Sequence, residues 1–202
     1  MTMKRIHPLL AFILLIAWVV TGCQSPKPKP SGGGGAAQAT RDNCYSLLHQ
    51  LLSDEKDVSL LRFIKREQSD VKILVKKIAT ASGTGAKQLE EFARQDPSLD
   101  LADTRLPPGE AATREAIAAT KQKELLGQSG DEFELSLLLS QSEALSYAAH
   151  LAKVAGENEL QPDRARALAD LNGKLTNLNQ EVFALLLSKT RTSGTNQVKN
   201  HK

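Results

Sequence analysis

Residues 168–185 have the sequence LADLNGKLTNLNQEVFAL. Apolar side chains recur in this stretch at alternating spacings of three and four, namely at Leu168, Leu171, Leu175, Leu178, Val182 and Leu185. This spacing places them along one face of an α-helix, in the pattern of helices that pack against other helices. The stretch therefore predicts a long amphipathic helix within a helical bundle.

A second seam with the same spacing comes earlier, at Leu61, Ile64, Gln68, Val71, Val75 and Ile78. Ser82-Gly83-Thr84-Gly85 follows it directly. Glycine in a helix interior is less favourable than alanine by about 1 kcal/mol. We therefore expect a kink or a break in this helix before Lys87.

Local signals predict the remaining helices. Leucines at 47, 48, 51 and 52 give a short amphipathic helix over residues 43–52, and Pro108 suits the first turn of a helix that follows the loop at 96–107. Ser129 and Glu132 form a capping box before the most apolar helix, which runs from Phe133 past Ala152, and Pro162 begins the last helix. No strand pattern is present, so we expect an all-α, up-and-down four-helix bundle with a short extra N-terminal helix.

The N-terminus has the features of a bacterial export leader. Lys4 and Arg5 precede an uncharged, apolar stretch, and small residues stand before Cys23. Val20-Thr21-Gly22-Cys23 resembles the lipobox of bacterial lipoproteins. The resemblance implies cleavage between Gly22 and Cys23, acylation of Cys23 and anchoring in a membrane through the acyl chains. Gln24 is compatible with delivery to the outer membrane, facing the periplasm.

Two alternatives to a lipidated N-terminus remain open. One is a transmembrane helix, but the apolar run is about fifteen residues long, short of the roughly 20 that a spanning helix needs. An ordinary secretory leader would leave Cys23 as a plain thiol, and a Cys23–Cys44 disulfide would then be possible. If Cys23 is lipidated, Cys44 is left as a thiol that is buried, paired between chains or reactive, and we expect it to be buried and inert.

Composition divides the chain into four parts. We expect a signal peptide at 1–22, a lipidated cysteine and a Pro/Lys/Gly-rich tether at 23–40, a helical domain at 41–188 and a basic, disordered tail at 189–202. Removal of the leader lowers the formal charge from +3 to +1, since Lys4 and Arg5 leave with no acidic residue. This near-neutral charge favours no nucleic-acid partner.

The residues give little support for catalysis. Two-metal carboxylate sites in helical bundles use Glu-x-x-His pairs, and the sequence contains none. It also lacks the Gly-x-Ser-x-Gly elbow of many hydrolases. We predict no catalytic residue, metal or cofactor, and name His150, Tyr147 and Glu143, close together on one predicted helix, as the candidates for contact with a ligand.

Residues 60–187 resemble a mostly exported bacterial family of unknown function, placed among the ferritin-like bundles and often labelled putative outer-membrane protein. The resemblance rests on Val71-Lys72 to Ile78, residues 89–93, Leu106-Pro107 and residues 130–134. It implies a ferritin-like fold in the cell envelope. Where that family has Asp-His this chain has Ala81-Ser82, and where it has a further histidine this chain has Leu145. The ligands that those histidines would provide are therefore missing.

These observations predict a lipid-anchored envelope protein with an interaction or structural role and no enzymatic activity. A second envelope protein is the expected kind of partner, and the oligomeric state is open. The alternative is a ferritin-like module of the periplasm that binds a ligand or a metal.

Overall fold

The computed structural model describes residues 33–57 and 68–199, with side chains up to Arg191. This part of the chain is all-helical, as expected. Its helices are α1 (Gly33–Glu55), α2 (Ser69–Gln95), α3 (Pro108–Gly127), α4 (Gly130–Glu157) and α5 (Pro162–Lys199). None of the described helices combines the length and the apolar character that a membrane span requires. The leader, Cys23, Leu61 and Ile64 lie outside the described residues.

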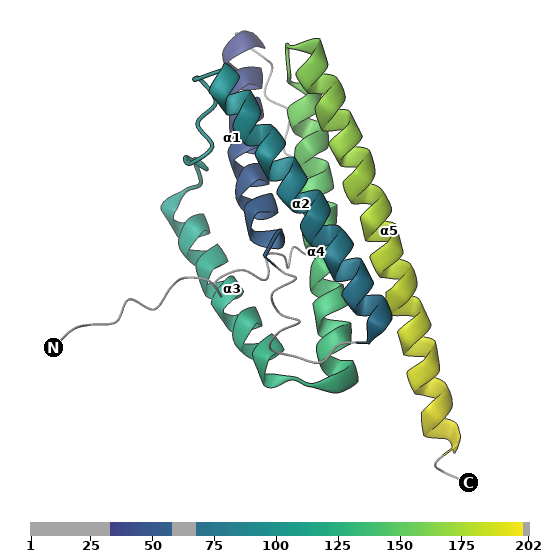
Figure 1. Ribbon diagram of the computed structural model, residues 1–202. Coiled ribbons are helices and arrows are strands. Elements are labelled where there is room, and N and C mark those ends of the chain that lie inside the picture. Colours follow the sequence, from purple (N-terminus) through teal and green to yellow (C-terminus); the bar gives the residue numbers. More distant parts are fainter. Residues whose placement is uncertain (1–32, 58–67, 200–202) are drawn as a thin grey trace, which may run out of the picture.

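Successive helices alternate in direction (Figure 1). Helix α4 packs against α5 and α1, α1 packs against α2, and α2 packs against α5. Helix α3 stands to one side and contacts chiefly α4 (Figure 1). Most of the described seam positions face the interior, since Leu168, Leu175 and Val182 of α5 and Ile78 of α2 are all at most 1% exposed. Gln68 was wrongly placed in the second seam, because it is exposed and precedes α2 as its N-cap.

The prediction of a short extra N-terminal helix is wrong. Helix α1 has 23 residues and begins at Gly33, inside the segment predicted to be a tether. Alanines at 36, 37 and 39 favour helix in this segment, and Thr40 Oγ1 donates to the carbonyl of Ala36 at 2.9 Å. Tyr45, Leu48 and Leu52 are essentially fully buried, so α1 contributes to the core while α3 is the outlying helix.

The predicted break at Gly83 and Gly85 is also wrong, because α2 is continuous from Ser69 to Gln95. A Cβ atom at position 85 would lie 2.9 Å from Leu52 Cδ1 and 3.1 Å from Leu171 Cδ1. The missing side chain therefore lets α1 and α5 approach α2 closely. Close packing offsets the low helix propensity of glycine.

Helix starts are confirmed at Pro108 and Pro162, and α4 begins directly after Ser129. The capping box is not formed, because the Ser129 side chain makes no capping hydrogen bond. The chain instead turns into α4 at Gly130, whose φ of +58° lies in the left-handed region that glycine tolerates.

The basic tail was expected to be disordered from residue 189, but α5 continues to Lys199. Lys189 Nζ lies 2.7 Å from Glu134 Oε2 and 3.7 Å from Asp70 Oδ1. The Glu134 side chain is nearly fully buried. This ion pair ties α5 to the start of α4 beyond the predicted end of the domain.

Candidate functional site

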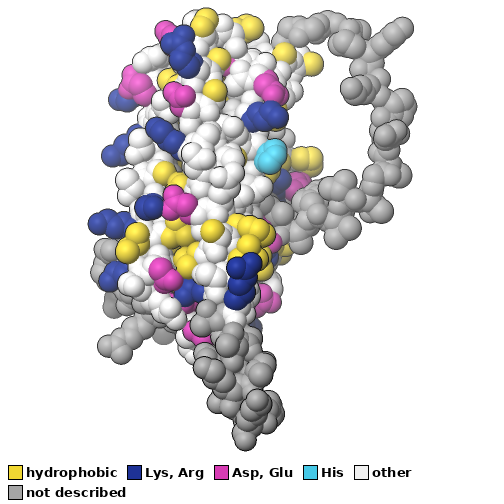
Figure 2. Space-filling model, turned by 90° about the vertical axis from the view of Figure 1, so that its right-hand side faces the viewer, with side chains coloured by type: hydrophobic (Ala, Val, Ile, Leu, Met, Phe, Trp, Pro, Cys, Tyr) yellow, Lys and Arg dark blue, Asp and Glu magenta, His cyan; other side chains and the backbone are white. Residues whose placement is uncertain are grey.

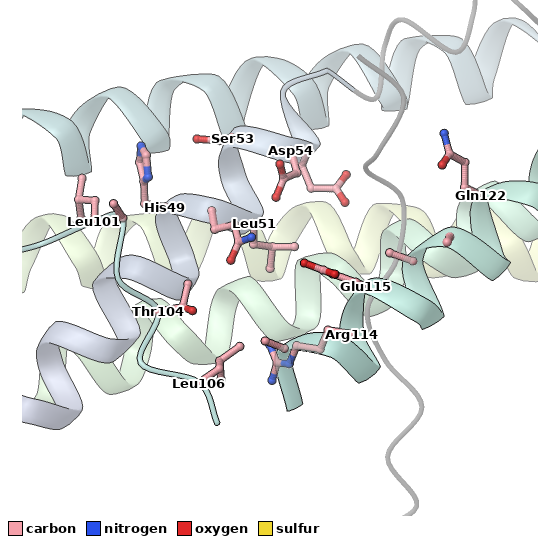
Figure 3. A pocket seen from close by; sticks show the side chains of 16 residues that line it. His49, Leu51, Ser53, Asp54, Leu101, Thr104, Leu106, Arg114, Glu115 and Gln122 are labelled. Atoms are coloured by element: carbon pink, nitrogen blue, oxygen red, sulfur yellow. The ribbon is translucent and has the colours of Figure 1, made fainter. Parts of the chain in front are cut away.

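A hollow of about 740 Å³ lies between the second half of α1, the loop at 96–107 and α3 (Figure 3). Its volume is within the range of about 300–1,000 Å³ that is usual for small-molecule sites. Most of the lining surface is apolar, although nine of the sixteen lining residues have polar or charged side chains. The lining includes Leu51, Asp54 and Glu55 of α1, Leu101 and Leu106 of the loop, and Arg114, Glu115 and Ala118 of α3.

The loop at 96–107 forms one wall and is held by local hydrogen bonds. Asp96, Asp100 and Asp103 each accept a hydrogen bond from the backbone N–H two residues later. The Asn43 side chain of α1 also donates to the carbonyl of Thr104. Leu99 is buried, and Leu101 and Leu106 pack against the core. This anchoring keeps α3 away from α1 and leaves space between them.

Helix α3 forms the opposite wall. Arg114 Nε donates to Glu110 Oε1 at 2.6 Å, and the guanidinium carbon lies 5.7 Å from the centre of the Tyr147 ring. Lys121 Nζ lies 3.0 Å from Glu143 Oε2. The contacts with Tyr147 and Glu143 join α3 to α4. Three of the six α3 residues that line the hollow are alanines, including Ala118, and these small side chains leave space beside α3.

Two carboxyl groups at the end of α1 line the hollow and lack ordinary partners. Asp54 Oδ2 and Glu55 Oε2 are both buried, and neither has a hydrogen-bond partner among the described residues. Burial, with a smaller contribution from the charge of Glu55, raises the pKa of Asp54 to about 9. Burial also raises the pKa of Glu55 to about 7, against a smaller lowering effect of the nearby Gln141 side chain.

Asp54 and Glu55 could hardly be recognised as a site from the sequence. They end a helix whose last turn contains no basic residue, where the negative end of the helix dipole disfavours further negative charge. Two acids at a helix end without a compensating base were the only available signal. That signal does not reveal burial, which depends on the loop and on α3.

The predicted ligand contacts are not brought together at the hollow. Glu143 and Tyr147 point toward α3, where they pair with Lys121 and Arg114. His150 is exposed, and its Nδ1 lies 2.7 Å from the carbonyl oxygen of Ser146 on its own helix. Within residues 33–57 and 68–199, no group of three or more His, Cys, Asp or Glu side chains is arranged to hold a metal ion.

Another polar cluster lies at the end of the domain where α4 meets α5. Tyr45 donates to Glu159 Oε2 at 2.8 Å, and Arg164 donates to Glu159 Oε1 and to Asp96 Oδ2, both at 3.0 Å. Burial alone would raise the pKa of Glu159, but hydrogen bonds from the Gln161 backbone, Tyr45 and Arg164 lower it. These contacts join four segments of the fold, although Arg164 Nε stays buried without a hydrogen-bond partner among the described residues.

Cys44 is a free thiol that is 7% exposed, as expected for a buried cysteine. Burial raises the pKa of the thiol, which keeps it protonated and unreactive.

Comparison with known proteins gives no match to a family model, a curated protein or a solved structure. The resemblances to lipoproteins and to ferritin-like bundles therefore stay expectations from the sequence.

Proposed function

We propose that the chain is a lipid-anchored protein of the cell envelope whose helical domain binds a small ligand and performs no catalysis. The hollow between α1, the loop at 96–107 and α3 is the observation that carries this proposal. An apolar lining with a few polar groups is typical of small-molecule sites. The proposal moves the expected binding site away from His150, Tyr147 and Glu143.

The binding part of the proposal is tested with n-hexanol, an uncharged probe with an apolar body. We suggest calorimetric titration of the full lipidated chain in nanodiscs of zwitterionic lipid, with empty nanodiscs as the blank. Ala118→Leu adds bulk inside the hollow and should weaken binding at least fivefold. Ala116→Leu makes the same change on the exposed side of α3 and should leave binding unchanged. If the two substitutions weaken binding equally, the hollow is not the binding site.

The anchor and the location are proposed from the leader alone. Lipidation of Cys23 after cleavage at Gly22 would hold the domain at the periplasmic face of the outer membrane. Cys23→Ser should abolish incorporation of labelled palmitate and move the protein into the aqueous phase of a detergent partition. A Cys23→Ser protein that still matures and enters the detergent phase would rule out the lipobox assignment.

The finer fold assignment is a proposal as well. The contacts α1–α2, α2–α5, α5–α4 and α4–α1 close a ring of four helices, which supports a four-helix bundle. A ferritin-like character rests on the resemblance of residues 60–187. In this assignment α1 is one of the four bundle helices and α3 lies outside the bundle, whereas the sequence analysis predicted that the N-terminal helix would be the extra one.

A second candidate function is contact with another envelope protein. Leu139 of α4 and Phe183 of α5 are each 56% exposed, and Leu187 is 42% exposed. Hydrophobic side chains gather over the lower part of the face shown in Figure 2. Cross-linking in intact cells should capture a partner less efficiently with Phe183→Ser. Leu160→Ser, which changes an exposed leucine between α4 and α5, is the matched control.

A further inference from the structure

Some charged side chains around the hollow have hydrogen-bond or ion-pair partners, and others have an oxygen without one. Among the acids, Asp54 and Glu55 keep one buried, unpartnered oxygen each in the described part of the chain. Glu55 is only 5% exposed, so water has little access to it. A buried carboxylate without a partner is costly, and a positive group beside it offsets that cost.

Arg114 and His49 line the hollow, but both contact carboxylates other than Asp54 and Glu55. Arg114 pairs with Glu110 at 2.6 Å and lies over the Tyr147 ring. His49 Nε2 lies 3.2 Å from Glu90 Oε1, on the α2 side. Lys56 follows the two acids in sequence, but it is exposed and does not line the hollow. The charge of Lys56 nevertheless lowers the pKa of Asp54, against the larger effect of burial. Within residues 33–57 and 68–191, no positive group lies within hydrogen-bond distance of Asp54 Oδ2 or Glu55 Oε2.

The end of α1 adds a further negative contribution. The carbonyl groups at a helix C-terminus have a partial negative charge, and the last turn of α1 contains no base. Both effects act at the same place and favour a cation. Leu51, Leu101, Leu106 and Ala118 line the remaining surface, which suits an apolar body attached to that cation.

We propose that the hollow binds an organic monocation, with an ammonium group at Asp54 and Glu55 and an apolar body against the leucines and α3. Figure 3 shows the arrangement, with Asp54 at the end of α1 and Arg114 and Glu115 on the opposite wall. A divalent metal ion suits the site less well, because two carboxylates beside apolar carbon supply too few oxygen ligands. This inference rests on the proposed function, since it names the chemistry of the ligand at the same site.

The test compares n-hexylammonium, n-hexanol and hexanoate by calorimetry with the full lipidated chain in nanodiscs, with empty nanodiscs subtracted. Hexylammonium should bind at least tenfold more tightly than hexanol, and hexanoate should bind least. The double variant Asp54→Asn/Glu55→Gln should abolish the preference, so that it binds hexylammonium no more tightly than it binds hexanol. Asp57→Asn removes an exposed charge close to the site but outside its lining, and should keep the preference.

The outcomes separate the two proposals. Binding of hexanol without a preference for hexylammonium would overturn the proposal of a monocationic ligand, but it would still support the hollow as a binding site. A preference that survives in the double variant would also overturn it. Failure of all three probes to bind would overturn both proposals. Nanodiscs that contain phosphatidylethanolamine distinguish two sources of the cation. If the ligand is an aminolipid, phosphatidylethanolamine should compete and weaken the binding of hexylammonium. If the ligand is a free amine, the affinity for hexylammonium should be the same in both kinds of nanodisc.

Discussion

At Gly85, α2 packs closely against α1 and α5. Its Cα–H side faces Leu52 and Leu171, which are 1% and 4% exposed and have little room to move. Gly85→Ala should therefore destabilise the domain by about 1 kcal/mol, because overpacking of a dense core outweighs the gain in helix propensity. Urea denaturation followed by circular dichroism measures the difference.

Gly83, two residues earlier on the same helix, provides the control. A Cβ atom there would meet only Lys56 Cβ, at 3.5 Å, which is ordinary van der Waals contact. Gly83→Ala should stabilise the domain by roughly 0.5–1 kcal/mol. If both substitutions stabilise the protein equally, the close approach of α1 and α5 to α2 at this level is not real.

Asp54 and Glu55 should make the stability of the free protein depend on pH. Their pKa values in the folded chain are about 9 and about 7, above the values of 3.8 and 4.5 that they have when unperturbed. The folded state thus holds protons that the unfolded state has released. Their contribution should weaken the fold as pH rises from about 4 to 9.

Asp54→Asn and Glu55→Gln should accordingly raise the free energy of unfolding at pH 8 and have much less effect at pH 4. Denaturation curves at the two pH values check this expectation. Asp57→Asn, at an exposed position, should leave the pH dependence unchanged. A loss of stability at pH 8 in the two test variants would show that the carboxylates are favourably paired in the free protein.

At the scale of elements, Glu159 joins four parts of the chain. It accepts hydrogen bonds from Tyr45 of α1 and Arg164 of α5, and Arg164 extends the link to Asp96 at the end of α2. Glu159→Gln leaves Arg164 without its buried counter-charge, so it should cost about 3 kcal/mol of stability. Thermal and urea denaturation both report this loss.

Glu157 is the matched control for that substitution. It lies two residues earlier, and its contact with Lys153 is exposed and 3.9 Å long. Glu157→Gln should change the free energy of unfolding by less than about 0.5 kcal/mol. Equal losses for Glu157→Gln and Glu159→Gln would mean that the cluster does not hold the elements together.

Helix α3 should be the least protected of the described helices away from their ends. Leu125 is its only buried residue, and its main contacts are with α4. Local opening requires little free energy where few apolar contacts are lost. Hydrogen exchange should be faster for amides at 116–120 than for amides at 148–152 of α4. Equal protection would indicate that α3 packs more firmly than its burial suggests.

The sequence predicted the elements better than their places in the fold. Pro108 and Pro162 constrain the chain locally, so the starts of α3 and α5 could be located without any knowledge of packing. The continuity of α2 could not be predicted, because the space that requires Gly85 is created by Leu52 and Leu171 of other helices. The extension of α5 depends in the same way on the pairing of Lys189 with Glu134.

For the whole molecule, the buried helix faces were predictable and the candidate site was not. Apolar spacing identifies which face of each helix is buried, and those faces form the core. The hollow arises because a well-anchored loop holds α3 away from α1. Asp54 and Glu55 then become buried between segments distant in sequence, and no local pattern contains that information. The histidine that the sequence favoured, His150, is left at the surface.

The most direct test of the central claim is to find where an alkylammonium binds on the whole protein. A hexylammonium analogue with an alkyl diazirine can be photo-cross-linked to the full chain in nanodiscs and mapped by mass spectrometry. We predict labelling confined to the end of α1, the loop at 96–107 and α3, and prevented by excess hexylammonium. Labelling on the exposed face at Leu139 and Phe183, or labelling that hexylammonium does not prevent, would contradict the account.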